Sequence, residues 1–110
     1  MAAVDAANQN LLNMSQDEWA TKEALEESIK EQLRLAMANG DVRGEEAREL
    51  TRMHASWIRM HWGQSAYTSQ AHRGLACGYL ADSRFRDYYD TAAGEGATDF
   101  LVEALLANLR

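Results

Sequence analysis

Apolar residues recur at intervals of three and four along most of the chain, the spacing of one buried face of an α-helix. The first such stripe includes Leu25, Ile29 and Leu33. It follows Ser15-Gln16-Asp17-Glu18, a capping box that marks a helix start, and it ends before Asn39-Gly40, a pair that suits a helix C-terminus. We therefore expect a first helix that runs to about Ala38.

Four more helices are expected in the rest of the chain. They cover about 45–62, about 69–80 after a cap at Thr68 or Ser69, a short stretch capped by Asp82 and broken at Gly94, and about 97–108. Proline is absent, and neither strand alternation nor an internal repeat appears in the sequence. The pattern predicts an all-α fold of about five crossed helices of unequal length, rather than a regular up-and-down bundle.

The length and the ends of the chain favour a single domain in the cytoplasm. A chain of 110 residues can build one core but not two. Residues 1–13 are small and polar and are interpreted as a flexible tail or linker before a domain at residues 14–110. The single cysteine cannot form an internal disulfide, the first residues lack the features of a signal peptide, and no apolar run is long enough to cross a membrane.

Charge argues against direct contact with nucleic acid. The net charge is −6, and the 11 Lys and Arg residues are spread along the chain instead of forming a basic patch. The carboxylates of the first helix, Glu26 among them, are interpreted as a solvated face. We expect an apolar, neutral or cationic ligand to be tolerated better than a polyanion.

The histidines and the cysteine do not form a catalytic or metal-binding pattern. His54 and His61 are seven residues apart, which is about 10 Å along a helix and too far for two ligands of one metal ion. Both, together with His72, are expected to have a buried ring and a hydrogen-bonded tip. Cys77 lies in the second half of its helix and is interpreted as a small buried packing residue.

No enzyme signature is present. The sequence contains neither an isolated carboxylate pair nor a glycine-rich phosphate loop. We expect no enzymatic activity, no cofactor and no metal, although one cysteine and three histidines would permit catalysis without requiring it.

Aromatic residues are concentrated in the middle of the chain. Seven of the nine lie within one 33-residue window: Trp57, Trp62, Tyr67, Tyr79, Phe85, Tyr88 and Tyr89. Most are expected in the core. Trp and Tyr also carry a polar group, which suits a cleft that receives amphipathic ligands.

An ordered set of motifs carries a family resemblance. The motifs are His54-x-x-Trp57-Ile58, His61-Trp62, Ser69-x-Ala71-His72-x-Gly74-Leu75, Tyr79-x-Ala81-Asp82-x-Arg84-Phe85, Tyr88-Tyr89-Asp90 and a closing Phe100-Leu101-x-x-Ala104-Leu105. In these residues the chain resembles the TipA-type antibiotic-recognition (TipAS) domain, the effector-binding part of some MerR-family multidrug-sensing transcription regulators. The resemblance covers about residues 15–110 and is strongest after His54.

The resemblance implies a globin-like fold without haem and a deep cleft for bulky, largely apolar antibiotics such as thiopeptides. In the regulators, ligand capture stabilises an activating state of the attached DNA-binding part. Together with the aromatic excess, the resemblance leads us to expect a ligand site formed by nine residues: His54, Trp57, His61, Trp62, His72, Tyr79, Phe85, Tyr88 and Tyr89.

The chain departs from the family pattern in three ways. The founding member attacks a dehydroalanine of its ligand with a cysteine that aligns with Gly74 here, so covalent capture is not expected. Helices that fold over the ligand in other members would be shortened or missing. The DNA-binding domain is also absent, so we expect DNA contact only through an attached domain.

Two alternatives to a regulator's effector domain remain at this stage. The chain could be a stand-alone protein that sequesters its drug ligand. It could also be a helical interaction module without a small-molecule ligand, in which exposed helix faces form a homodimer or pair with a DNA-binding partner and the aromatic cluster is only core.

Overall fold

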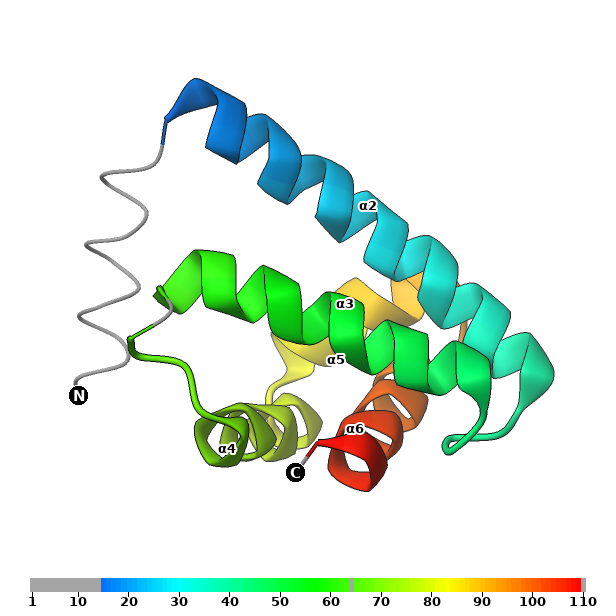
Figure 1. Ribbon diagram of the computed structural model, residues 1–110. Helices are drawn as coiled ribbons and strands as arrows, with labels where there is room; N and C mark the ends of the chain where they lie inside the picture. Colours follow the sequence, from blue (N-terminus) through cyan, green and yellow to red (C-terminus); the bar gives the residue numbers. More distant parts are fainter. Residues whose placement is uncertain (1–14, 64, 110) are drawn as a thin grey trace.

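The computed structural model describes residues 15–63 and 65–109, and this part of the chain folds into five helices without any strand (Figure 1). The helices are α2 (Gln16–Asn39), α3 (Glu45–Trp62), α4 (Ser69–Ala81), α5 (Ser83–Ala93) and α6 (Ala97–Asn108). The all-α fold with five helices is confirmed. The expected tail over residues 1–13 lies outside the described residues.

The helices begin and end where local side chains and glycines predict. Ser15 caps α2 by accepting a 3.2 Å hydrogen bond from the Glu18 backbone N–H. Gly40 ends this helix with φ 79°, a left-handed conformation that glycine adopts without steric cost. Thr68 caps α4 and Asp82 caps α5, each through its side-chain oxygen. These four boundaries follow from short-range chemistry alone.

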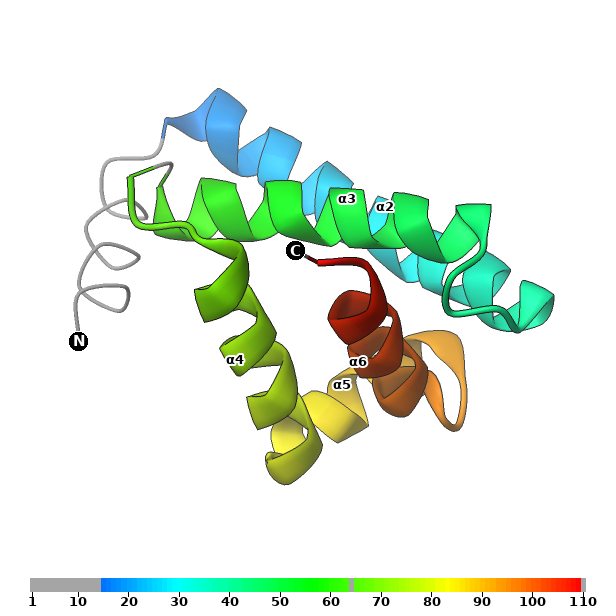
Figure 2. The same ribbon diagram turned by 60° about the horizontal axis from the view of Figure 1, so that its bottom comes forward.

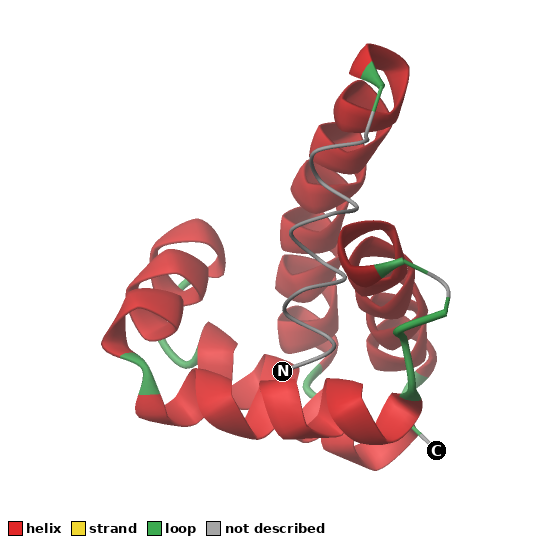
Figure 3. Ribbon diagram, turned by 90° about the vertical axis from the view of Figure 1, so that its left-hand side faces the viewer, coloured by secondary structure: helices red, strands yellow, loops and turns green. Residues whose placement is uncertain are grey.

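Two layers of helices make up the described part of the molecule. α2 and α3 run in opposite directions and pack along one another (Figure 1). Their contact is the most extensive between any two of the described helices. α4 and α6 run across the direction of α3, and α5 connects their far ends (Figure 2). The connections are short, and the N-terminal end of α2 extends beyond the other helices (Figure 3). The crossed arrangement predicted from the sequence is therefore present.

The core is built around α6. This helix contributes six buried residues, among them Leu101, Val102 and Leu105, while α2 contributes Ile29, Leu33 and Ala36. The buried residues of α2 other than Lys22 lie in its C-terminal half. The buried apolar residues thus gather at one end of the molecule, where α6 meets the end of α2 and the start of α3.

The interpretation of Cys77 as a buried packing residue is wrong. The thiol side chain is exposed. The buried positions of α4 are His72, Ala76 and Tyr79, so the packed face of this helix passes beside Cys77 and not through it. Gly74 lies on the same exposed side, and no neighbouring atom lies within 4 Å of the position that a side chain there would take.

Candidate functional site

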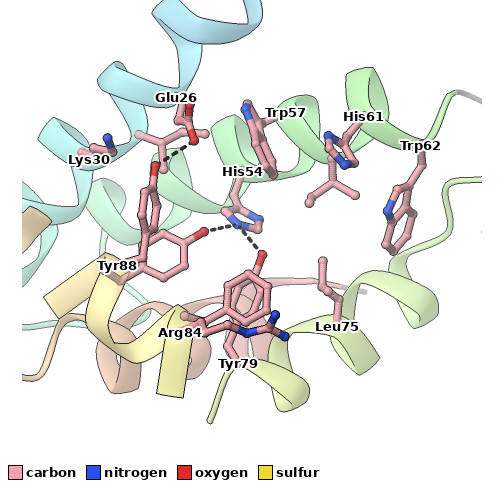
Figure 4. Close-up of a pocket in the computed structure, with 14 residues that line it drawn as sticks. Glu26, Lys30, His54, Trp57, His61, Trp62, Leu75, Tyr79, Arg84 and Tyr88 are labelled. Atoms are coloured by element: carbon pink, nitrogen blue, oxygen red, sulfur yellow. Dashed lines mark hydrogen bonds between the residues drawn. The ribbon is translucent and has the colours of Figure 1, made fainter. Parts of the chain in front are cut away.

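A cavity of about 550 Å³ lies between α2, α3, α4 and α5 and is partly open to solvent. Its walls are mainly aromatic and aliphatic (Figure 4). The lining residues are Glu26, Ile29 and Lys30 of α2; His54, Trp57, Ile58, His61 and Trp62 of α3; Leu75 and Tyr79 of α4; and Arg84, Phe85, Tyr88 and Tyr89 of α5. Four consecutive helices therefore meet at one site.

Ring contacts hold the aromatic walls in place. Trp57 and His61 are one turn apart on α3, and their rings stack with centroids 5.3 Å apart and planes tilted by 20°. Opposite them, Tyr79 contacts Phe85 with centroids 4.5 Å apart. Such contacts restrict the rotamers of these side chains, so the flat faces are oriented before any ligand arrives.

Charged side chains on α2 and α5 form one part of the wall. The Tyr88 hydroxyl donates a 2.7 Å hydrogen bond to Oε1 of Glu26. The ammonium of Lys30 lies 4.9 Å from the centre of the Tyr88 ring, a cation–π contact, and its pKa is raised chiefly by the hydrogen bond to Glu27. The expectation that Glu26 is merely part of a solvated face is wrong, because this side chain is half-buried and holds Tyr88 against α2.

The floor of the cavity is polar and buried. His54 is 1% exposed, and its Nε2 lies 3.4 Å from both the Tyr79 and the Tyr89 hydroxyl oxygens (Figure 4). Burial lowers the pKa of His54 to about 3, with a smaller contribution from neighbouring His72. The ring is therefore neutral at physiological pH. Burial raises the pKa of Tyr79 to about 12 and raises the pKa of Tyr89 as well, so both hydroxyls keep their protons.

His72 lies behind this floor, not in it. It is fully buried, and its Nε2 is 2.8 Å from Nδ1 of His54. Its Nδ1 is 2.8 Å from the hydroxyl oxygen of Tyr67, in the segment between α3 and α4. Burial, together with the nearby charge of Arg59, lowers the pKa of His72 to about 4. The prediction of buried histidines with hydrogen-bonded tips is confirmed for both His54 and His72.

A buried lysine supports the Trp57 wall from outside the cavity. Lys22 is 7% exposed, and its ammonium lies 4.5 Å from the centre of the Trp57 ring and 5.3 Å from that of Trp19. Two indole faces thus take the place of water around this charge. Burial lowers the pKa of His61, and the positive charge of Lys22 lowers it further. Nothing in the sequence pattern distinguished Lys22 from a solvated lysine.

Eight of the nine residues expected in the site line the cavity, and the ninth, His72, contacts His54 from behind. The expected site omitted six further lining residues: Glu26, Ile29, Lys30, Ile58, Leu75 and Arg84. The apolar stripes of the helices mark Ile29 and Ile58 as buried, but they do not show whether such a residue lines a cavity or packs in the core. Gly74 and Cys77 do not line the cavity.

The described part of the chain has neither a metal-binding cluster nor a membrane-spanning helix. No cluster of three or more His, Cys, Asp or Glu side chains there has the geometry to hold a metal ion. Among the described helices, none combines the length and the apolar character needed to span a bilayer.

Comparison with known proteins places the sequence in a family. The family model described as the TipAS antibiotic-recognition domain matches residues 1–108. Searches of curated proteins and of solved structures returned no match. The family match covers nearly the whole chain and includes every residue that lines the cavity.

Proposed function

The chain belongs to the family of TipAS antibiotic-recognition domains, and we propose that it binds hydrophobic antibiotics or similar drug-like molecules in the cavity lined by α2, α3, α4 and α5. The proposal rests chiefly on one observation, the presence of a large aromatic-lined cavity in a small domain. Small-molecule sites typically have volumes of about 300 to 1,000 Å³ and apolar walls with a few polar groups. The volume and the lining of this cavity fit that description.

The residues expected to contact the ligand divide by chemistry. Trp57, Trp62, Phe85 and Tyr88 offer flat apolar surface, and His54, His61, Tyr79 and Tyr89 add polar atoms. His72 would act on the ligand only through His54. Each well-buried aromatic contact contributes roughly 1 to 3 kcal/mol, so a few of them suffice for micromolar affinity.

We further propose that ligand capture is non-covalent and that the domain is not an enzyme. Neither Cys77 nor Gly74, the position that aligns with the reactive cysteine of the founding member, lines the cavity. The exposed thiol of Cys77 would have to attack a ligand from outside the site. A ligand held by apolar contacts needs no bond to the protein.

The biological setting that we propose is the effector-binding domain of a MerR-family, TipA-like transcription regulator in the cytoplasm, which controls transcription and drug resistance. DNA would be bound only by an attached domain. A stand-alone drug-sequestering protein would use the same cavity. The large apolar residues exposed on the described surface are Trp19, Leu35, Leu80 and Tyr88, which lie on three different helices, so the interaction-module alternative has less support.

Ligand binding can be tested with a panel of thiopeptides and other hydrophobic antibiotics. Because Trp57 and Trp62 line the cavity, we expect a true ligand to change indole fluorescence and to raise the melting temperature. Trp62→Ala removes one wall and should weaken binding by about 5- to 150-fold, the equivalent of about 1 to 3 kcal/mol.

Leu35→Ala serves as the matched control, because Leu35 is 52% exposed and does not line the cavity. Its affinity for the same antibiotic should stay within about 2-fold of the wild type. If no compound of the panel changes either fluorescence or melting temperature, the proposed function is wrong.

A further inference from the structure

One carboxylate lies in the mainly apolar wall of the cavity, and we propose that it makes the site selective for aromatic ligands that carry a protonated amine. The residue is Glu26 of α2, which among the described residues is the one acidic side chain that lines the cavity. This inference rests on the proposed function, because it concerns which drug-like molecules the same cavity prefers.

Glu26 is held in place through one of its two carboxylate oxygens. Oε1 accepts a 2.7 Å hydrogen bond from the hydroxyl of Tyr88, which belongs to α5 (Figure 4). Burial raises the pKa of Tyr88 and the bond to Glu26 raises it further, so the hydroxyl keeps its proton and remains the donor. Within the described part of the chain, Oε2 accepts no hydrogen bond, and this atom is not enclosed by protein. The second oxygen is therefore available to a ligand.

The positive side chains in the cavity wall do not neutralise Glu26. Lys30 and Arg84 line the cavity, but each forms an ion pair with a carboxylate that does not line it. The ammonium of Lys30 is 3.0 Å from Oε1 of Glu27, and the guanidinium of Arg84 is 2.8 Å from Oδ2 of Asp82. No ion pair joins Glu26 to another described residue. Glu26 is thus an unpaired negative charge in the wall.

The two other titratable groups close to Glu26 do not place a positive charge in the cavity. Lys22, one turn earlier on α2, does not line it, and its ammonium lies against the rings of Trp19 and Trp57. His61 does line the cavity, but burial and the charge of Lys22 lower its pKa, so the ring is mostly neutral at pH 7. The net charge of the chain, −6, also favours a cation over an anion.

A ligand that fills the cavity displaces water from the free oxygen of Glu26. A purely apolar ligand gives no hydrogen bond in return, and a buried charge without a partner is costly. A ligand ammonium restores the bond, and hydrogen bonds between charged groups are roughly twice as strong as those between neutral groups. The aromatic walls add to the preference, because ring faces attract cations. The preferred ligand therefore has a flat apolar body and one protonated amine.

Three anthracene probes that differ in one substituent test the preference. 9-Aminomethylanthracene carries an ammonium group, 9-anthracenemethanol a neutral hydroxyl, and anthracene-9-carboxylate a negative charge. We expect wild-type protein to bind the ammonium probe at least about 5-fold more tightly than the alcohol, and the carboxylate more weakly than either. The fluorescence of the anthracene ring measures all three affinities. An alcohol that binds as tightly as the ammonium probe would overturn the inference.

Glu26→Gln removes the charge and keeps an oxygen that can accept the Tyr88 hydroxyl. It should weaken the ammonium probe by at least about 5-fold and leave the alcohol within about 2-fold, so the preference disappears. Glu23→Gln is the matched control, because it changes the net charge equally at an exposed residue that does not line the cavity. All three affinities should stay within about 2-fold there. Equal losses of the ammonium probe in both variants would mean that only net charge matters, and would overturn the inference.

Tyr88→Phe separates a direct contact with the ligand from a structural role of Glu26. It removes the hydroxyl that bonds to Glu26 and keeps the carboxylate. The ammonium probe should therefore still bind more tightly than the alcohol, whatever the change in either affinity. A preference lost as completely as in Glu26→Gln would show that Glu26 acts only by holding Tyr88, and the inference would be wrong.

The probes also separate this inference from the proposed function. If all three bind equally, or if none binds while an antibiotic of the panel does, Glu26 does not select cations and the proposed function stands. If neither the probes nor any antibiotic binds, both fail.

Discussion

At the scale of single residues, the buried polar groups carry most of what is specific to this domain. His54 and His72 stack with ring centroids 4.9 Å apart and planes tilted by 13°. The sequence predicts that each is buried and hydrogen-bonded, because each lies on the apolar stripe of its helix. It does not predict that they bond to each other, since this depends on how α3 and α4 cross.

The pair should make stability depend on pH. Each histidine has a folded pKa, about 3 and about 4, that lies below the value of 6.5 in the unfolded chain. Between these values the unfolded chain binds more protons, so the free energy of unfolding is largest above about pH 6.5 and falls as the pH falls toward 4. We expect a loss of about 2 kcal/mol per histidine between pH 7 and pH 5, measured by urea unfolding.

The variant His72→Gln separates this effect from other titrations. It removes one of the two depressed histidines, so the slope of unfolding free energy against pH between 6.5 and 5 should fall by about one proton, or about 1.4 kcal/mol per pH unit. His61, whose pKa is also lowered, remains in both proteins. An unchanged slope would mean that His72 titrates normally in the folded protein.

At the scale of helices, boundaries and contacts between helices differ in how far they can be predicted. Capping residues such as Thr68 and Asp82 act on amides two or three residues away, so the sequence shows them directly. Other helix ends are satisfied from a distance. Arg34 of α2 donates two hydrogen bonds to the Ala92 carbonyl near the end of α5, and Arg73 of α4 donates to the Leu106 and Leu109 carbonyls at the end of α6. No local pattern marks these arginines as caps.

The start of α6 depends on one such contact. Gly96, the residue before this helix, has no side chain to cap it. Asp90 of α5 accepts hydrogen bonds from both the backbone N–H and the hydroxyl of buried Thr98, at 2.9 and 2.8 Å. The backbone bond is the chief reason why the pKa of Asp90 lies below its usual value. The motif Tyr88-Tyr89-Asp90 therefore includes a residue with a structural task.

We expect Asp90→Ala to lower the free energy of unfolding by about 1 to 3 kcal/mol, because it leaves two buried donors of Thr98 without the carboxylate. Urea unfolding monitored by circular dichroism measures this change. The control is Asp87→Ala on the same helix, where the side chain is exposed and the expected change is within about 0.5 kcal/mol. Equal stability of the two variants would show that α6 does not rely on Asp90.

At the scale of the whole molecule, the sequence predicts the aromatic half of the site and misses the half on α2. Tryptophans and tyrosines are conspicuous because few cores need so many of them. Glu26 and Lys30 lie among other charged residues of a long helix and become cavity walls only because α5 packs against that face. The pattern of residues within one helix cannot show which other helix packs against it, so these two residues could not be predicted from the sequence as part of the site.

The described molecule thus has a closed end around α6 and an open end at the cavity, and the two ends should respond differently to loss of side-chain volume. Leu101 of α6 is fully buried, so Leu101→Ala creates a new enclosed void and should cost about 2 to 5 kcal/mol of unfolding free energy. Leu75 of α4 is half-buried and already borders the cavity, so Leu75→Ala enlarges an existing space and should cost less than about 1.5 kcal/mol. Urea unfolding of both variants measures the difference. If Leu75→Ala costs as much as Leu101→Ala, side chains fill the cavity in solution, and a ligand would have to displace them before it could bind.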